Sequence, residues 1–269
     1  MQSQLSRRGV FGLLPAAFAL PAFADAQGTP TSTQASGALW PEFPAQNPKL
    51  VFEMIGAAHG NLDKVKELVA ISPNLAKATY DWGYGDWESA IGAAAHVGSH
   101  DIIKVLLDNG ARPDIFTFAT MGNVAALKAM IEANPGIQKT FGPHGITLLT
   151  HARIGGEPAK AALEYLTSLG DAGNAATNLP ITDAEKEKYL GTYKFGAAPN
   201  DQFVVSLNRN KALVMTREGT IGRSLQRVEE HAFAVAAAPH LRIRFKVEGE
   251  KAVSLTIHEP TPIVTALRA

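Results

Sequence analysis

The sequence has 269 residues, with 25 Lys and Arg side chains against 25 Asp and Glu side chains, and 46% of it is hydrophobic. This length suggests two domains of ordinary size or one long one, and the hydrophobic share is that of a folded protein. The balanced charge argues against a nucleic-acid-binding protein, which normally carries an excess of basic residues. The chain has no cysteine, which excludes disulfides, thiolate catalysis and cysteine-ligated metal sites.

Residues 1–24 have the pattern of an export signal. Arg7 and Arg8 precede an apolar run over residues 12–24 that ends in a small-x-small cleavage site. The run is too short for a membrane span, which needs about 20 residues. The arginine pair resembles a twin-arginine signal. Because Gly12 stands where that motif often has a basic residue, an ordinary Sec signal is the alternative. Either signal predicts a periplasmic protein.

Cleavage after Ala24 would make the mature protein mildly acidic. It removes two of the 25 basic residues and none of the 25 acidic ones, which leaves a formal charge of −2. Residues 25–48 are predicted to be a flexible leader, since they are rich in Gly, Thr, Ser, Gln, Ala and Pro. No other run is long and apolar enough to span a bilayer, so we expect no membrane-spanning segment.

The segment with the clearest helical pattern is 89–111. Ala94 and Ala95 are small enough for close packing of a first helix, and Gly98 would turn the chain into a second. The apolar stripe of that second helix consists of Ile102, Ile103, Leu106 and Leu107. Gly110 follows as a helix-ending glycine. Taken together, this segment resembles an ankyrin repeat.

Weaker copies of the pattern flank it at residues 60–69, 122–131 and 147–166. Residues 147–152 stand where the family has Thr-Pro-Leu-His-x-Ala, but the proline is missing. We therefore predict an all-α ankyrin solenoid of four units over residues 49–175, stabilised by stacking of its repeats. The resemblance implies that a protein partner binds along the fingers and the concave face.

The predicted finger between the first two units is long and aromatic. Its candidate partner-binding residues are Tyr80, Trp82, Tyr84, Asp86 and Trp87. Aromatic rings beside carboxylates suit stacking on a ligand ring, a sugar or a cationic side chain. The alternative is that Trp82 and Trp87 cap the core of the first repeat.

Two histidines, His96 and His151, are candidates for the concave partner-binding face. Hydrogen bonding in the turns is the alternative for His96, and for His59 beside the turn of the first unit. His144 falls in the fourth unit. His96 and His100 are four residues apart, but a turn separates them, so they would not share a helical face. We therefore predict no metal site, no cofactor and no catalytic residue.

After a turn-rich linker, predicted over residues 176–185, the hydrophobic period changes from helical to two. Apolar and polar residues alternate over 241–247 and again over 253–257, which predicts a β-hairpin. Residues 203–215 predict another. Six to eight antiparallel strands over 186–269 would form a small barrel or half-barrel.

The opening of this β domain, Tyr189-Leu190-Gly191-Thr192-Tyr193, resembles the small lipocalin-like domain that accompanies serine β-lactamase-type and peptidase enzymes in bacteria. That resemblance implies an accessory binding module, whose interior is more simply filled by side chains than by a ligand. A candidate anion patch comprises Arg217, Arg242 and Arg244, together with Arg223 and Arg227. The alternative is an ordinary solvated sheet face.

Two classes of function follow. The first is an exported, non-catalytic scaffold that holds a protein partner on its fingers and concave face. The alternative is a periplasmic small-ligand-binding protein or enzyme that uses the aromatic finger or a cavity of the β domain.

Overall fold

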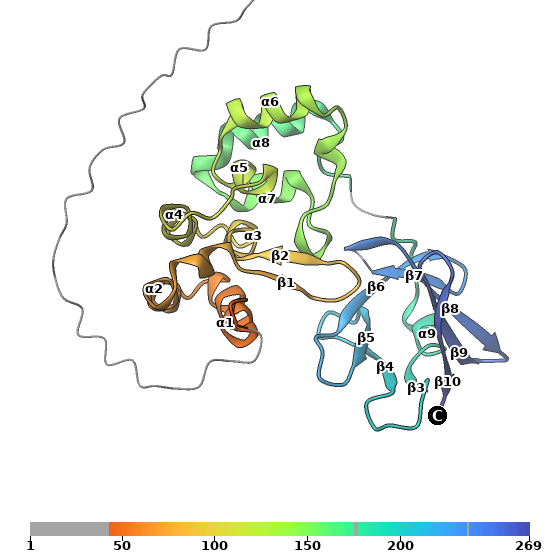
Figure 1. The fold of residues 1–269 in the computed structure, drawn as a ribbon. Helices are drawn as coiled ribbons and strands as arrows, with labels where there is room; N and C mark the ends of the chain where they lie inside the picture. The colour runs from red at the N-terminus through yellow and green to blue at the C-terminus, as the bar shows by residue number, and fades with distance from the viewer. Residues whose placement is uncertain (1–42, 175–176, 236) are drawn as a thin grey trace, which may run out of the picture. The chain divides into compact units, whose positions relative to one another are not determined.

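The computed structural model describes residues 43–174, 177–235 and 237–269, all within one compact unit, Pro41–Ala269. The predicted export signal and most of the leader lie outside these residues. The described chain begins with helices and ends with a β-barrel (Figure 1). Its nine described α-helices are α1 (Pro48–Ala58), α2 (Leu62–Ile71), α3 (Ala90–His96), α4 (His100–Asp108), α5 (Ile115–Thr120), α6 (Val124–Ala133), α7 (Leu148–Ile154), α8 (Lys160–Leu169) and α9 (Asp183–Lys186).

Helices α1 to α8 pack as successive pairs, and the first helices of these pairs, α1, α3, α5 and α7, contact one another in turn. Side chains that cap the backbone N–H groups define where several helices start: Asn61 caps α2, Asn123 caps α6 and Thr147 caps α7. Gly98 turns the chain between α3 and α4 at a φ of +72°, and a Cβ there would lie 2.6 Å from the Ile154 carbonyl oxygen. This turn therefore requires glycine.

Two hydrophobic clusters hold the helices together. The first joins α1 to α4 and includes Met54, Ile55 and Leu106, all fully buried. The second joins α5 to α8 around Leu127 and Leu166. Between the helices lie four 3₁₀ helices: η1 (Pro73–Lys77), η2 (Ile137–Lys139), η3 (Pro143–Gly145) and η4 (Glu157–Ala159).

A two-stranded antiparallel sheet interrupts the helices between η1 and α3. Strands β1 (Thr79–Asp81) and β2 (Trp87–Ser89) pair in a register that sets Tyr80 opposite Glu88. The Ser89 side chain caps α3 by accepting from Gly92 N–H. The strand therefore passes directly into the helix, which fixes Glu88 against the start of α3.

The second half is a closed antiparallel barrel (Figure 1). Its strands are β3 (Gly191–Lys194), β4 (Gln202–Leu207), β5 (Leu213–Arg217), β6 (Arg223–Glu229), β7 (Ala232–Val235), β8 (Ala238–Glu248), β9 (Lys251–His258) and β10 (Pro262–Arg268). Strands β8 and β9 confirm the alternation predicted over 241–247 and 253–257. Strand β10 closes the barrel by pairing with both β9 and β3.

Aromatic side chains form the centre of the barrel core. The rings of Phe233 and Phe245 each lie 4.9 Å from the ring of Tyr189. Tyr193 is fully buried, and its hydroxyl donates to the Tyr189 carbonyl at 2.7 Å. Burial raises the pKa of Tyr193 to about 12, because water no longer solvates the phenolate.

The predicted fold class, an all-α ankyrin solenoid followed by a barrel or half-barrel, is wrong. The described helices are only 4 to 11 residues long, and 3₁₀ helices and the β1–β2 sheet interrupt them. The β domain is a fully closed barrel of eight strands. The prediction extended the regularity of residues 89–111 to neighbours that lack it.

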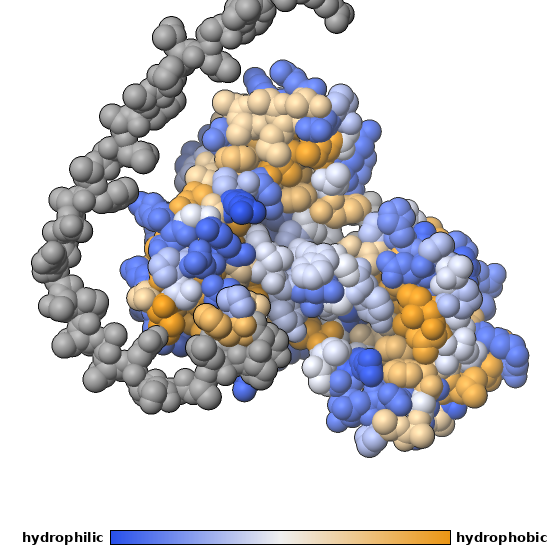
Figure 2. Space-filling model, in the orientation of Figure 1, coloured by the Kyte–Doolittle hydropathy of each residue, from blue (hydrophilic) through white to orange (hydrophobic). Residues whose placement is uncertain are grey.

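No described helix combines the length and hydrophobicity that crossing a bilayer requires. Figure 2 shows hydrophobic residues in patches among hydrophilic ones.

Candidate metal centre

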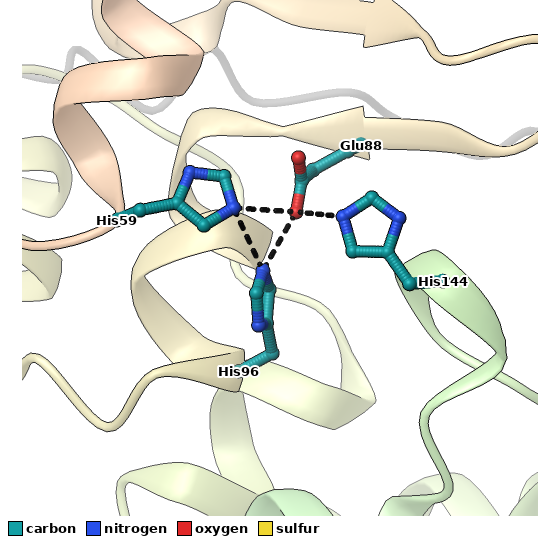
Figure 3. A group of neighbouring side chains, drawn as sticks. All are labelled: His59, Glu88, His96 and His144. Carbon is teal, nitrogen blue, oxygen red and sulfur yellow. Dashed lines mark hydrogen bonds and ion pairs between the residues drawn. The ribbon is translucent and has the colours of Figure 1, made fainter. Parts of the chain in front are cut away.

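Three histidines and one glutamate from four separate elements converge on one point (Figure 3). His59 directly follows α1, Glu88 lies on β2, His96 is the last residue of α3, and His144 lies in η3. One ligand atom of each side chain lies within 4.8 Å of every other.

The distances in this cluster are those of donor atoms around a single ion. Glu88 Oε1 lies 2.9 Å from His96 Nε2, 3.3 Å from His144 Nε2 and 3.6 Å from His59 Nε2. The Nε2 atoms of His59 and His96 are 3.0 Å apart. Tetrahedral ligands bound to zinc at 2.0–2.1 Å would be separated by about 3.3 Å. The observed spacings bracket that value.

Hydrogen bonds to the opposite ring nitrogen orient two of the imidazoles. His59 Nδ1 lies 2.8 Å from the Ile55 carbonyl oxygen, and His144 Nδ1 lies 2.9 Å from Asp86 Oδ2. Because a carbonyl and a carboxylate only accept, Nδ1 carries the hydrogen in both rings. Nε2 of each ring therefore faces the cluster, as in histidines that bind metals.

The hairpin loop supports the remaining groups. Trp82 Nε1–H donates to Glu88 Oε2 at 2.7 Å, which leaves Oε1 for the cluster. Asp86 also accepts from the backbone N–H of His144 at 2.9 Å, and holds that residue at a φ of 60°. Arg223 Nη2 lies 2.9 Å from Asp86 Oδ2. Each cluster residue with such a partner is thus fixed at both ends.

The cluster carries strongly perturbed charges. Burial acts to raise the pKa of Glu88, but hydrogen bonds from His144 and His96 outweigh it and hold the pKa at about 2. Hydrogen bonds to Asp86 and Glu88 raise the pKa of His144 to about 9. For Asp86, the hydrogen bonds from His144 outweigh burial and lower the pKa. Two ionised carboxylates therefore face these histidines at neutral pH.

The cluster is open on one side. His59 and His144 line a cavity of about 310 Å³ together with Trp82, Ile221 and Arg223. Glu88, in contrast, is fully buried. A ligand entering this cavity would reach the two histidines from the solvent side.

The predicted aromatic finger divides into different roles. Trp82 and Asp86 contact Glu88 and His144 of the cluster, respectively. The other three members lie apart from it: Tyr80 packs on the helical core, Tyr84 packs on the barrel core, and Trp87 is 61% exposed.

The predicted concave histidines also separate. His96 belongs to the cluster, whereas His151 is buried in α7, where its Nδ1 donates to the Thr147 carbonyl. Burial lowers the pKa of His151.

The predicted arginine patch is engaged in local contacts. Arg217 lies 3.8 Å from Asp201, and Arg244 pairs with Glu229 at 2.9 Å. Arg242 donates to the carbonyls of Pro239 and Leu241. Of the five arginines, Arg223 is the one that reaches the hairpin and lines the cavity beside the cluster.

Sequence reasoning assigned no ligand role to His59, Glu88 or His144. His59 and His96 are 37 residues apart and Glu88 and His96 are 8 apart, so no short spacing motif exists. The available signal was an acidic residue at the end of an aromatic hairpin, directly before a helix that ends in histidine.

A scan against protein-family models finds no match to this chain. A search of curated proteins likewise finds no similar sequence.

Proposed function

We propose that this protein binds one divalent transition-metal ion through His59, His96, His144 and Glu88. The observation that carries the proposal is the convergence of three imidazole nitrogens and a carboxylate oxygen within 4.8 Å. Three imidazoles with one carboxylate suit zinc, iron, nickel or copper, whereas magnesium and calcium prefer oxygen ligands.

The hydrogen bonds around the cluster give independent support. Asp86 orients His144, the Ile55 carbonyl orients His59, and Trp82 orients Glu88. Outer partners of this kind fix the ring that presents the binding nitrogen and strengthen metal binding.

The open side favours a centre that also takes a small ligand. Structural zinc sites have four protein ligands and are closed, whereas catalytic sites keep a position for water or substrate. The cavity beside His59 and His144 supports the second type. A bound ion would act there as a Lewis acid on a ligand oxygen. Of the two functions expected from the sequence, this supports the small-ligand alternative.

Calorimetry on the metal-stripped protein tests the proposal. We expect one equivalent of Zn²⁺ or Co²⁺ to bind, and Mg²⁺ not to bind. His96→Ala should weaken zinc binding by more than about 100-fold, because it removes a ligand rather than an outer partner. Glu88→Gln should also weaken it.

His240→Ala is the matched control, because His240 is exposed on the barrel. It should bind zinc like the unaltered chain. Equal zinc affinity in His96→Ala and His240→Ala would overturn the proposal.

A further inference from the structure

A second, apolar cavity adjoins the one beside the metal centre. We call it the barrel pocket; it has a volume of about 400 Å³. Its apolar lining includes Tyr84, Phe195, Phe203, Met215, Ile257 and Val264. Trp82, Ile221 and Arg223 line both cavities, so the two are neighbours with a shared wall. An aromatic and aliphatic lining with few polar groups is typical of a small-molecule site.

Arg223 is the charged group at this shared wall. Its side chain is 11% exposed. Although Nη2 lies 2.9 Å from Asp86, neither Nη2 nor Nε makes a well-directed hydrogen bond within the part of the chain described. Buried guanidinium donors are normally satisfied, and a carboxylate matches their geometry. Arg223 is thus suited to an anionic group entering from the cavities.

The metal ion of the proposed function would change the charge of this place. With neutral histidines, Glu88 and Asp86 carry two negative charges against one positive charge on Arg223. A divalent ion would turn this net charge of about −1 into about +1. The site would then attract an anion, whereas the metal-free site would not.

We propose that the two cavities together bind an amphipathic carboxylate. Its apolar body occupies the barrel pocket, and its carboxylate lies at Arg223, beside the metal ion. The position next to the ion rests on the proposed metal centre; the apolar pocket and Arg223 do not.

Decanoate is the probe, measured by calorimetry on the zinc-loaded chain. We expect decanoate to bind at least tenfold more tightly than decanol, which lacks the charge, and acetate, which lacks the apolar body. Binding to the zinc-free chain should be at least tenfold weaker.

Two variants test the wall residues. Arg223→Met should weaken decanoate binding at least tenfold, and Arg244→Met, on the barrel but outside both cavities, should not. Ile221→Asp places a negative charge at the shared wall and should weaken binding equally. Because Ile221 is 55% exposed, this variant keeps the test informative if Arg223→Met does not fold. Zinc affinity is measured in each variant alongside.

The outcomes are distinguishable. Decanol binding as tightly as decanoate, or unchanged decanoate binding in Ile221→Asp and in folded Arg223→Met, would overturn the proposal. Equal decanoate binding with and without zinc would overturn the position beside the ion. If the chain binds no zinc but decanoate binding still depends on Arg223, the metal function fails and the carboxylate pocket stands.

Discussion

Asp86 provides the sharpest test of how the cluster is organised, because it contacts His144 without belonging to the four ligands. It is almost fully buried, and it accepts from both the Nδ1 and the backbone N–H of His144 at 2.9 Å. In Asp86→Asn, one oxygen can still accept from the backbone, but an amide NH₂ would face Nδ1. His144 would then favour the tautomer with the hydrogen on Nε2, the atom that must be free to bind the ion.

The magnitude follows from the single bond that is lost. A hydrogen bond to a charged group contributes about 1.5–3 kcal/mol, which corresponds to roughly 10- to 150-fold in a dissociation constant. Loss of outer partners in known metal sites costs about 10- to 100-fold. We therefore expect Asp86→Asn to weaken zinc binding by about 10- to 100-fold.

Competition with a chromophoric chelator at pH 7.5 measures this change. Asp81→Asn is the control, because Asp81 lies in the same hairpin and accepts only from the Gly83 N–H among its described hydrogen bonds. That variant should bind zinc normally. A folded Asp86→Asn protein whose zinc affinity stays within threefold of the original would refute the orienting role of Asp86.

Three further predictions concern stability. Gly122→Ala should destabilise the helical part by at least about 1–3 kcal/mol in thermal unfolding, because φ is +74° and the new Cβ would lie 2.1 Å from the Pro158 oxygen. Leu127→Ala should cost about 2–5 kcal/mol in urea unfolding, because Leu127 is fully buried. Tyr193 has a pKa raised to about 12, above its unfolded value near 10, so its contribution to stability is present below pH 10 and is lost between pH 10 and 12. Urea unfolding at pH 8 and pH 11 should therefore show a smaller loss of stability with pH in Tyr193→Phe than in the original chain.

Each of these has its own check. Gly56→Ala, in α1 where a Cβ meets nothing within 4 Å, should be neutral or slightly stabilising. Leu179→Ala, at a position 42% exposed, should cost much less than Leu127→Ala. Spectrophotometric titration should find one fewer high-pH tyrosinate in Tyr193→Phe; an unchanged titration would contradict the burial argument.

Local chemistry made part of this fold predictable. Gly98 and the apolar stripe from Ile102 correctly indicated two helices, which are α3 and α4. Strict alternation correctly indicated β8 and β9. Both signals arise from residues that are close in sequence and share one face of a single element.

The regular solenoid and the cluster were beyond such reasoning. The hairpin at 79–89 was read as a long finger, because its strands have only three residues each. His59, Glu88 and His144 meet only after α1, β2 and η3 have packed together. Their proximity is a property of tertiary structure, so periodicity and spacing carried no signal for it.

Closure of the barrel gives the final strand a duty beyond its own hydrogen bonds. Strand β10 lies between β9 and β3, and the N–H of Ala269 donates to the Thr192 carbonyl. Removing it would leave two strands with unpaired backbone groups at once, one at the start of the barrel and one near its end. Open edges of this kind are templates for strand addition between molecules. The last residues of the chain therefore protect the barrel from self-association as well as completing it.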